Sequence, residues 1–356
     1  MTMLPPGSTI GILGGGQLGK MLAIAAAQMG YRCHIYAPEE NSVAAEVAAE
    51  FTCAAYDDVA ALSTFADGCD LITYEFENVP VAPLRVIEAG TPILPNIRAL
   101  EIAQDRVEEK LFAAKLGGRT ARFAEVADQA DAPAAFAKIG FPSILKTIRM
   151  GYDGKGQARV TCEADIPDAL AQIGMQPAIA EAMVQFDAEF SVILARNGDG
   201  DIRFWDSPRN RHEGGILAYS TLPAGPLIEA QQAEARKLAA AAAEELGYVG
   251  VMTMEFFATA EGPLFNEMAP RVHNSGHWTI EGAATSQFEN HIRAVCNLPL
   301  GATHLLVDRI EMENLIGDAA NNWAKLFADD SASVHLYGKG APSPGRKMGH
   351  VTRLYR

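Results

Sequence analysis

The sequence predicts a multidomain protein of mixed α/β and α+β class, with a parallel α/β unit at the amino terminus and a small β subdomain at the carboxyl terminus. Three observations predict it. An apolar strand runs through a glycine-rich turn into a helix over residues 9–29, apolar or alternating runs typical of antiparallel strands follow residue 178, and the turn Gly338–Gly345 separates short strand-like segments. At 356 residues the chain exceeds the size of a single growing core, so several packed domains are expected.

The first unit is predicted to be a Rossmann-like parallel sheet over residues 1–98. Its first strand, Thr9–Leu13, leads into the turn Gly14–Gly19. The following helix carries apolar residues on one face, namely Leu18, Met21, Leu22, Ala25, Ala26 and Met29. Further strands are predicted at Cys33–Tyr36, Leu71–Tyr74 and Thr91–Leu94. Strands that alternate with helical stretches favour parallel pairing.

A central domain is predicted over residues 99–185, and it includes a hairpin lid. A helix over Glu101–Leu116 precedes the strand Ser143–Lys146. The loop Gly151–Gln157 then joins that strand to a second one at Ala158–Thr161. Because the loop is rich in glycine, we expect it to close and open over whatever lies beneath it.

An antiparallel sheet with one interrupting helix is predicted to make up most of the rest. Its strands are Ala178–Val184, Glu189–Ala195, Ile202–Asp206, Gly250–Phe257 and Leu264–Met268. Asp199-Gly200 turns one hairpin, and the helix is Leu227–Leu246. The predicted domain covers residues 186–298, and a β subdomain over 299–356 packs on it.

Composition excludes several classes of protein. The net charge of −15 and a pI near 5.0 argue against nucleic-acid binding, which requires a broad basic face. There is no run of eighteen apolar residues, and Met1–Pro6 lacks the pattern of a secretion signal, so we expect no membrane association and a cytoplasmic protein. Five scattered cysteines without a Cys-x-x-Cys pair predict reduced thiols.

The turn Gly14-x-Gly16-x-x-Gly19 matches a dinucleotide-binding fingerprint, but two interpretations stay open. Such glycines allow backbone to approach an anion at a helix amino terminus, as in a nucleotide-binding dehydrogenase or sensor. The acidic residue expected after the second strand is poorly matched, because Ala37-Pro38 intervene before Glu39. A turn required only for packing is the alternative.

The loop Gly151–Gln157 has the composition of a segment that folds its N–H groups over phosphates. Lys146 ends an apolar strand just before it, where a lysine is costly to bury without an anionic partner. A bound phosphate would be such a partner. A solvated surface hairpin is the alternative interpretation.

Two glutamates interrupt strongly apolar strands, Glu255 in Met254–Phe257 and Glu267 in Phe265–Met268. Both would be costly if unpaired. If adjacent antiparallel strands bring them together, the carboxylates and the Asn266 amide oxygen form a hard oxygen site suited to Mg²⁺ held with nucleotide phosphates. Pairing with nearby arginines is the alternative.

A dense polar cluster follows Glu267. Arg271, His273, Asn274 and His277 lie within seven residues, which predicts an anion site, with His273 beside Arg271 functional and His277 structural. A second cluster, Lys339, Arg346 and Lys347, borders the terminal glycine- and proline-rich turn. It is either a solvated basic turn or a patch for a sugar phosphate.

Taken together, Gly-Gly-Gly-Gln-Leu-Gly near the start, Gly-Tyr-Asp-Gly-Lys-Gly-Gln in the middle and Asn-Glu-Met-Ala-Pro-Arg-Val-His-Asn-Ser-Gly-His-Trp-Thr later resemble the 5-(carboxyamino)imidazole ribonucleotide synthetases. The resemblance spans almost the whole chain. It implies an ATP-grasp fold, a homodimer, and a carbon–nitrogen ligase of purine biosynthesis that uses ATP, Mg²⁺ or Mn²⁺, and bicarbonate. In that reaction carboxyphosphate forms, and the amine of aminoimidazole ribonucleotide captures its CO₂ unit. Another ATP-grasp ligase, such as one that uses formate, is the alternative.

The resemblance also assigns residues. It implies an ATP site made of Arg106, Lys146, Gly151, Tyr152, Asp153, Gly154, Lys155, Gly156, Gln157, Glu181, Ala182, Met183, Val184, Glu189, His212, Asn266 and Glu267. Metal ligands are Glu255 and Glu267. For the ribonucleotide it implies Gln17, Leu18, Glu75, Lys339, Arg346 and Lys347. Around bicarbonate and the imidazole it places the catalytic set Tyr152, Asp153, Arg271, His273 and Asn274.

Overall fold

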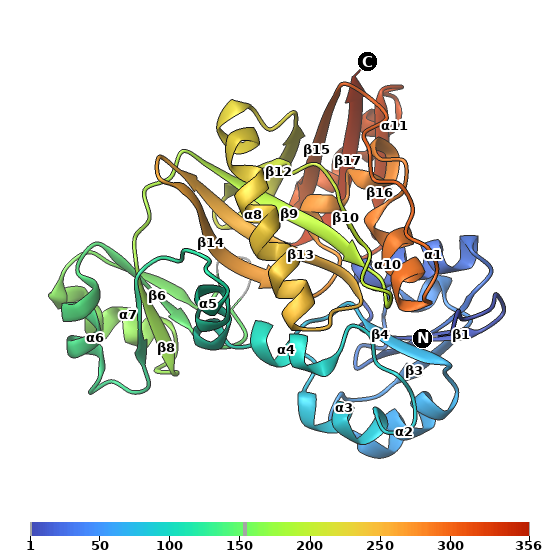
Figure 1. The fold of residues 1–356 in the computed structure, drawn as a ribbon, viewed down its shortest axis with the longest axis horizontal. Coiled ribbons are helices and arrows are strands. Elements are labelled where there is room, and N and C mark those ends of the chain that lie inside the picture. The colour runs from blue at the N-terminus through green and yellow to red at the C-terminus, as the bar shows by residue number, and fades with distance from the viewer. Residues whose placement is uncertain (1, 152–154, 356) are drawn as a thin grey trace.

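The computed structural model describes residues 2–151 and 155–355, and within them the strands form three sheets (Figure 1). The amino-terminal sheet lies at the lower right of the view, a smaller sheet lies at the left, and the largest occupies the centre and upper right. No helix in these described ranges is both long and apolar enough to cross a membrane. The predicted domain limits at residues 98, 185 and 298 stay predictions.

The amino-terminal sheet is parallel, with strand order β3-β2-β1-β4. Its strands are β1 Thr9–Leu13, β2 Arg32–Ala37, β3 Glu50–Cys53 and β4 Leu71–Tyr74, and its helices are α1 Gln17–Gln28, α2 Val59–Asp67 and α3 Val81–Ile87. The expected strand Thr91–Leu94 is wrong, since only a single bridge joins Ile93 to Ile72 in the described chain. Pro92 and Pro95 flank that bridge and have no N–H to extend a ladder.

The left-hand unit is an antiparallel sheet of order β5-β8-β6-β7 with its own apolar core. Its strands are β5 Phe123–Val126, β6 Ser143–Thr147, β7 Gln157–Val160 and β8 Ala178–Ala182, and its helices are α6 Ala132–Ile139 and α7 Ile166–Gln172. We expected β8 in the large sheet, and this was wrong: β8 pairs with β5 and β6 instead. A strand's pattern shows that one or both faces are buried but not which neighbour it meets.

The central sheet has the order β14-β13-β9-β11-β12-β15-β17-β16, with β10 beside β9. Its strands are β9 Ala188–Arg196, β10 Ile202–Phe204, β11 Arg209–Glu213, β12 Ile216–Leu222, β13 Gly250–Thr259, β14 Gly262–Ala269, β15 Arg309–Ile316, β16 Ala332–Leu336 and β17 Lys347–Tyr355. The associated helices are α8 Pro226–Glu245, α9 Thr279–Gly282, α10 Gln287–Val295 and α11 Trp323–Phe327. Because β12 pairs with β15, the carboxy-terminal strands continue this sheet (Figure 1). Short 3₁₀ turns lie at Ala45–Val47, Glu163–Asp165, Asn274–Gly276 and Gly317–Asn322.

The expected helix Glu101–Leu116 is interrupted, and this is a correction. It is divided into α4, Ile97–Ala103, and α5, Arg106–Lys115. The carboxylate of Asp105 accepts hydrogen bonds from the N–H groups of Val107 and Glu108, so it caps a new helix rather than continuing the first. As a result Arg106 stands at the start of α5.

His291 on α10 connects the amino-terminal sheet to the central sheet. Its Nδ1 accepts the N–H of Val251 on β13 at 3.1 Å, and its Nε2 lies 2.8 Å from Oγ1 of Thr73 on β4. The ring is fully buried, and burial lowers its pKa to about 3. The neutral ring therefore donates from Nε2 and accepts at Nδ1, which joins the two sheets by one side chain.

Protonation of His291 should destabilise the fold at acid pH. An unfolded histidine takes up a proton near pH 6.5, whereas the folded ring stays neutral to about pH 3, so the unfolded state binds more protons between these values. The stability advantage of the native chain over His291→Gln should therefore shrink by about 1.4 kcal/mol per pH unit below 6.5. Urea unfolding of both chains at pH 7.5, 5.5 and 4.5 measures this, and a pH-independent difference would contradict it.

Candidate active site

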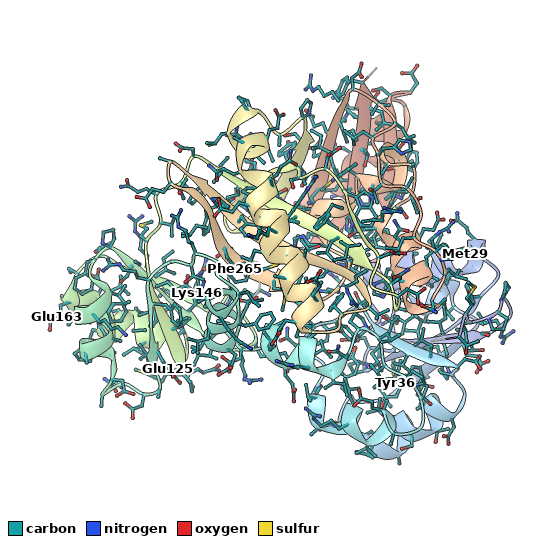
Figure 2. The ribbon with its side chains drawn as sticks, viewed as in Figure 1. Met29, Tyr36, Glu125, Lys146, Glu163 and Phe265 are labelled. Atoms are coloured by element: carbon teal, nitrogen blue, oxygen red, sulfur yellow. The ribbon has the colours of Figure 1, made fainter. Side chains whose placement is uncertain are left out.

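A cavity of about 670 Å³ lies where the three sheets meet. Of the predicted site residues, the lining contains Gln17, Leu18, Glu75, Arg106, Lys146, Gly151, Lys155, Gln157, Glu189, His212, Glu255, Asn266, Glu267, Arg271, His273, Asn274 and Lys347. Among the described residues, the predicted ones that do not line it are Gly156, Glu181, Ala182, Met183, Val184, Lys339 and Arg346. Tyr152, Asp153 and Gly154 lie outside the described residues. Figure 2 shows Lys146 on the side of the left-hand unit nearest the central sheet, with Glu163 at the far end of that unit.

The two strand glutamates lie opposite one another. Glu255 on β13 pairs in register with Glu267 on β14, and the register shifts directly after this pair, so Asn266 is an extra residue in β14. Such a bulge turns successive side chains toward the same side, and both Asn266 and Glu267 line the cavity. Burial, together with the charge of Glu267, raises the pKa of Glu255 to about 7.

One of the two glutamates, Glu267, pairs with an arginine, which was the alternative interpretation for both. Arg106 Nη1 lies 3.1 Å from a carboxylate oxygen of Glu267, and Nη2 donates to the C=O of Gly151 at 3.0 Å. Although burial opposes it, the Arg106 charge lowers the pKa of Glu267. Glu255 instead faces His273, with Nε2 and Oε1 3.5 Å apart. Arg106 thus connects the carboxylates to the start of the glycine-rich loop.

Lys146 has a protein partner that sequence reasoning did not identify. Its Nζ lies 2.9 Å from Glu181, whose other carboxylate oxygen is 3.2 Å from Nζ of Lys110 on α5. Burial alone would raise the pKa of Glu181, but the two lysines lower it to about 2. Two cations that share one carboxylate leave a net positive charge beside the cavity.

Glu109 and Lys110 were missed, although the sequence carries a signal for them. They stand one turn before the buried Phe112 and Ala113, so the apolar face of α5 includes both charges. Glu109 accepts the N–H of Met268, the residue after Glu267. Burial and the charge of Glu267 raise the pKa of Glu109 to about 8.

Another part of the cavity lining combines a polar pair with an apolar wall. His212 Nδ1 lies 2.5 Å from the carboxylate of Glu189. Burial lowers the pKa of His212, but this hydrogen bond and the charges of Glu255, Glu189 and Glu267 together outweigh burial, so the pKa is raised. Phe186 and Phe257, which were also missed, stack with ring centroids 4.5 Å apart and line the same space. Aromatic rings beside a polar pair suit a planar base and its ribose.

The glycine turn at the start of α1 is filled by Glu75. Its Oε1 accepts the N–H of Gly16 at 2.8 Å, and burial raises its pKa. A Cβ at Gly14, where φ is +124°, would come within 2.4 Å of the Glu75 side chain. The position that a dinucleotide pyrophosphate would require is therefore taken by a carboxylate, which argues against the dehydrogenase interpretation.

Arg271 lies beside this turn and pairs with Glu77. Nε of Arg271 donates to the Glu77 carboxylate, and the Glu77 charge raises the pKa of Arg271 against the effect of burial. Glu77 follows Glu75 by two residues, so the segment after β4 supplies both. The three basic residues near the terminal turn are placed differently. Lys347 lines the cavity, whereas Arg346 is exposed. Nζ of Lys339 lies 5.5 Å from the centroid of the Tyr337 ring.

His273 and Asn274 complete the lining. The N–H of Ser275 donates to Nδ1 of His273, and burial followed by the charge of Arg271 holds the pKa of His273 well below its usual value. The neutral ring therefore carries its proton on Nε2, toward Glu255. The buried Asn274 amide has no hydrogen-bond partner for either end among the residues described. Buried amides are rarely left without a partner, and this one belongs to a residue that lines the cavity.

Three family models match successive parts of the chain. They are the Ribonucleotide synthetase preATP-grasp domain over residues 7–104, the ATP-grasp domain over 111–288, and the Phosphoribosylaminoimidazole carboxylase C-terminal domain over 311–356. The ATP-grasp match spans parts of two of the four predicted domains. The predicted ATP-grasp fold with its parallel amino-terminal sheet is confirmed.

Curated relatives and solved structures agree with these matches. N5-carboxyaminoimidazole ribonucleotide synthase of Brucella melitensis biotype 1 is 49% identical over 99% of this chain and 98% of its own. The synthetase structure from Thermus thermophilus has a TM-score of 0.90 at 45% identity, covering 97% of this chain and 93% of its own. The Aspergillus clavatus synthase, solved with ADP and 5-aminoimidazole ribonucleotide, has a TM-score of 0.91 at 31% identity, covering 98% and 94%. This chain therefore belongs to the N5-carboxyaminoimidazole ribonucleotide synthase family of ATP-grasp proteins.

Proposed function

We propose that the protein carboxylates the exocyclic amine of 5-aminoimidazole ribonucleotide with ATP and bicarbonate, giving N5-carboxyaminoimidazole ribonucleotide, ADP and phosphate, in purine biosynthesis. The observation that carries this is one cavity that joins two sets of groups. Glu255 and Glu267 line it with Lys146 and Arg106, and so does the Arg271–Asn274 segment with Glu75, the two sets meeting where His273 faces Glu255. A ligase that forms an activated acid and then consumes it needs both sets within one enclosed space.

The residues present fit a divalent cation. Glu255 and Glu267 supply carboxylate oxygens on opposed strands, and Asn266 adds an amide oxygen at the bulge. The pKa of Glu255 is raised by burial and then by the charge of Glu267, and a bound cation would offset both effects. No cluster of three or more potential ligands among His, Cys, Asp and Glu occurs in the described part of the chain. The protein therefore offers few ligands, and Mg²⁺ or Mn²⁺ would be held partly by ATP phosphates. There the cation would neutralise charge on the transferring phosphoryl group.

ATP is proposed to lie between the left-hand unit and the central sheet. The base would face the stacked rings of Phe186 and Phe257, and the ribose hydroxyls would face Glu189. Lys146 would bind the phosphates as a point charge, and Arg106 would bind them with its forked guanidinium. Both border the cavity, and each is held in place by a protein contact, Lys146 by Glu181 and Arg106 by the C=O of Gly151. The glycine-rich loop would exclude water above them.

The chemistry would run in two balanced steps. A bicarbonate oxygen attacks the γ-phosphorus, the bond to ADP breaks, and carboxyphosphate forms. The amine nitrogen then attacks the carboxyl carbon, phosphate leaves, and the amine loses one proton. Arg271, the Nε2–H of His273 and the unpartnered Asn274 amide would hold the carboxyphosphate oxygens, since all three residues line the cavity and each carries an N–H donor. Lys347 would attract the ribonucleotide phosphate.

Release of ADP tests this function directly. We expect sustained ADP formation to need aminoimidazole ribonucleotide and bicarbonate together, because bicarbonate accepts the phosphoryl group and the carboxyphosphate that results is consumed only when the amine captures its carboxyl unit. A coupled ADP assay with each substrate omitted in turn, and with formate in place of bicarbonate, measures it. Absence of ADP with both substrates present, or equal turnover with formate, would overturn the proposal. NAD binding without ATP binding would favour the dehydrogenase alternative.

We propose further that the enzyme is a cytoplasmic homodimer, as the family resemblance implies. Light scattering coupled to size-exclusion chromatography should give a mass near twice 38.0 kDa. A concentration-independent mass of one chain would contradict the dimer. Fractionation of cells that carry a tagged chain tests the compartment.

A further inference from the structure

Gln287, the first residue of α10, holds His273 through both of its backbone groups. Oε1 of Gln287 accepts the N–H of His273 at 2.9 Å, and Nε2 donates to the C=O of the same residue at 2.6 Å. The Gln287 side chain is fully buried. Because an amide that binds both groups of one residue allows neither sliding nor rotation without losing a bond, this contact fixes the backbone of His273.

The rest of the polar segment is folded around the same side chain. Nε2 of Gln287 also lies 3.3 Å from Nδ1 of His277, and a Cβ at Gly276 would come within 2.7 Å of Oε1. Thr279 Oγ1 accepts the Gln287 N–H at 3.0 Å and donates to the C=O of Gly276 at 2.6 Å. The glycine is therefore required for the close approach of Gln287 to the chain.

The ring of His273 is supported from a second direction. Its Nδ1 lies 2.8 Å from Oγ of Ser275, which lies 2.9 Å from Oγ of Ser191 on β9. Asn210 on β11 donates to Ser191 at 2.6 Å and accepts from Ser220. These contacts set the rotation of the ring, whereas Gln287 sets the position of the backbone that carries it.

We propose that Gln287 is a positioning residue for the carboxylation step. His273 and Asn274 line the cavity, while Gln287 stands behind them and acts through His273. It keeps Nε2 of His273 directed at Glu255 and at the space where the carboxyl group is transferred. This inference rests on the proposed function, because the reaction measured in its test is the proposed carboxylation.

A matched control lies on the same helix. Asn290, also fully buried, binds Gly301 in the same two-sided way: Oδ1 accepts its N–H at 2.7 Å and Nδ2 donates to its C=O at 3.2 Å. Gly301 lies in the loop after α10, away from the cavity lining. Gln287→Glu and Asn290→Asp therefore make the same chemical change, amide to carboxylate, in equivalent backbone contacts.

The test compares kcat and KM for these two variants with thermal unfolding as the measure of folding. Both should lose stability, because each places a carboxylate oxygen against a carbonyl. Gln287→Glu should also lower kcat by about 100-fold through misplacement of His273, with KM for ATP unchanged. Asn290→Asp should keep its kcat. If Gln287→Glu fails to fold, Gln287→Met removes both bonds without adding charge and carries the same expectation.

A double-variant cycle separates positioning from general damage. In a His273→Ala background, Gln287→Glu should lower kcat by less than about threefold, since the residue through which it acts is gone. An undiminished effect in that background, or equal losses of kcat in Gln287→Glu and Asn290→Asp, would overturn the inference. These outcomes are read against native turnover. If the native chain shows no carboxylation, the proposed function fails, and the comparison of Gln287→Glu with Asn290→Asp is then made on the ADP-forming reaction that the chain does catalyse.

Discussion

Replacing Glu267 by glutamine is expected to lower kcat by about 100-fold or more, because the change removes one of two opposed carboxylates proposed to hold the cation. Folding should be affected far less. A glutamine carbonyl can still accept the hydrogen bond from Arg106, which now donates to the carboxylate. The measurement is ADP release as a function of Mg²⁺ concentration, together with a thermal unfolding curve.

A control for Glu267→Gln exists on the same hairpin. Glu261 lies at the turn between β13 and β14 with 85% of its side chain exposed, so Glu261→Gln makes the same substitution without reaching the cavity. Its turnover should match that of the native chain. Native turnover in Glu267→Gln at every Mg²⁺ concentration would refute the metal assignment.

Removing Arg271 should have the second largest effect, and on two separate properties. Arg271→Met leaves the carboxylate of Glu77 without its partner, which should cost about 2–4 kcal/mol. This is less than for a fully enclosed pair, because Glu77 keeps 24% of its side-chain exposure. Turnover should fall by at least about 100-fold, since a fixed donor to the developing charge is lost.

The double variant Arg271→Met/Glu77→Gln distinguishes these two effects. Neutralising Glu77 removes the uncompensated charge, so stability should return toward the native value. Turnover should stay low, because the donor is still absent. Urea unfolding and ADP release measured on the native chain and the three variants test this. A double variant that regains activity would show that Arg271 only neutralises Glu77.

Much of the site could be predicted because charge within apolar sequence is informative. Glu255 and Glu267 interrupt buried strands, and a group so costly to bury requires a partner, which led to their opposed placement. The register that sets them opposite was not predictable. It depends on the bulge at Asn266, and a one-residue slip would have turned one carboxylate to the other face.

What the sequence did not predict was the contacts between distant segments. The glycine turn has the same local pattern whether it receives a pyrophosphate or the carboxylate of Glu75, a residue 59 positions from Gly16. Similarly, the partner of Lys146 is Glu181, 35 positions later in a strand assigned to the wrong sheet. A local sequence pattern predicts which residues are buried and whether they form a helix or a strand, but it does not predict which segments come into contact.

The position of β17 within the sheet determines when the site can be completed during synthesis of the chain. This strand, near the carboxyl end, lies between β15 and β16 and brings Lys347 to the cavity. Chains fold progressively as they leave the ribosome, amino-terminal parts first. The amino-terminal and left-hand sheets can form early, but a nascent chain that has not yet emerged through β17 cannot hold a complete site. A product of translation truncated before β17 would therefore carry the groups proposed to face ATP but would lack Lys347, which is proposed to attract the ribonucleotide phosphate.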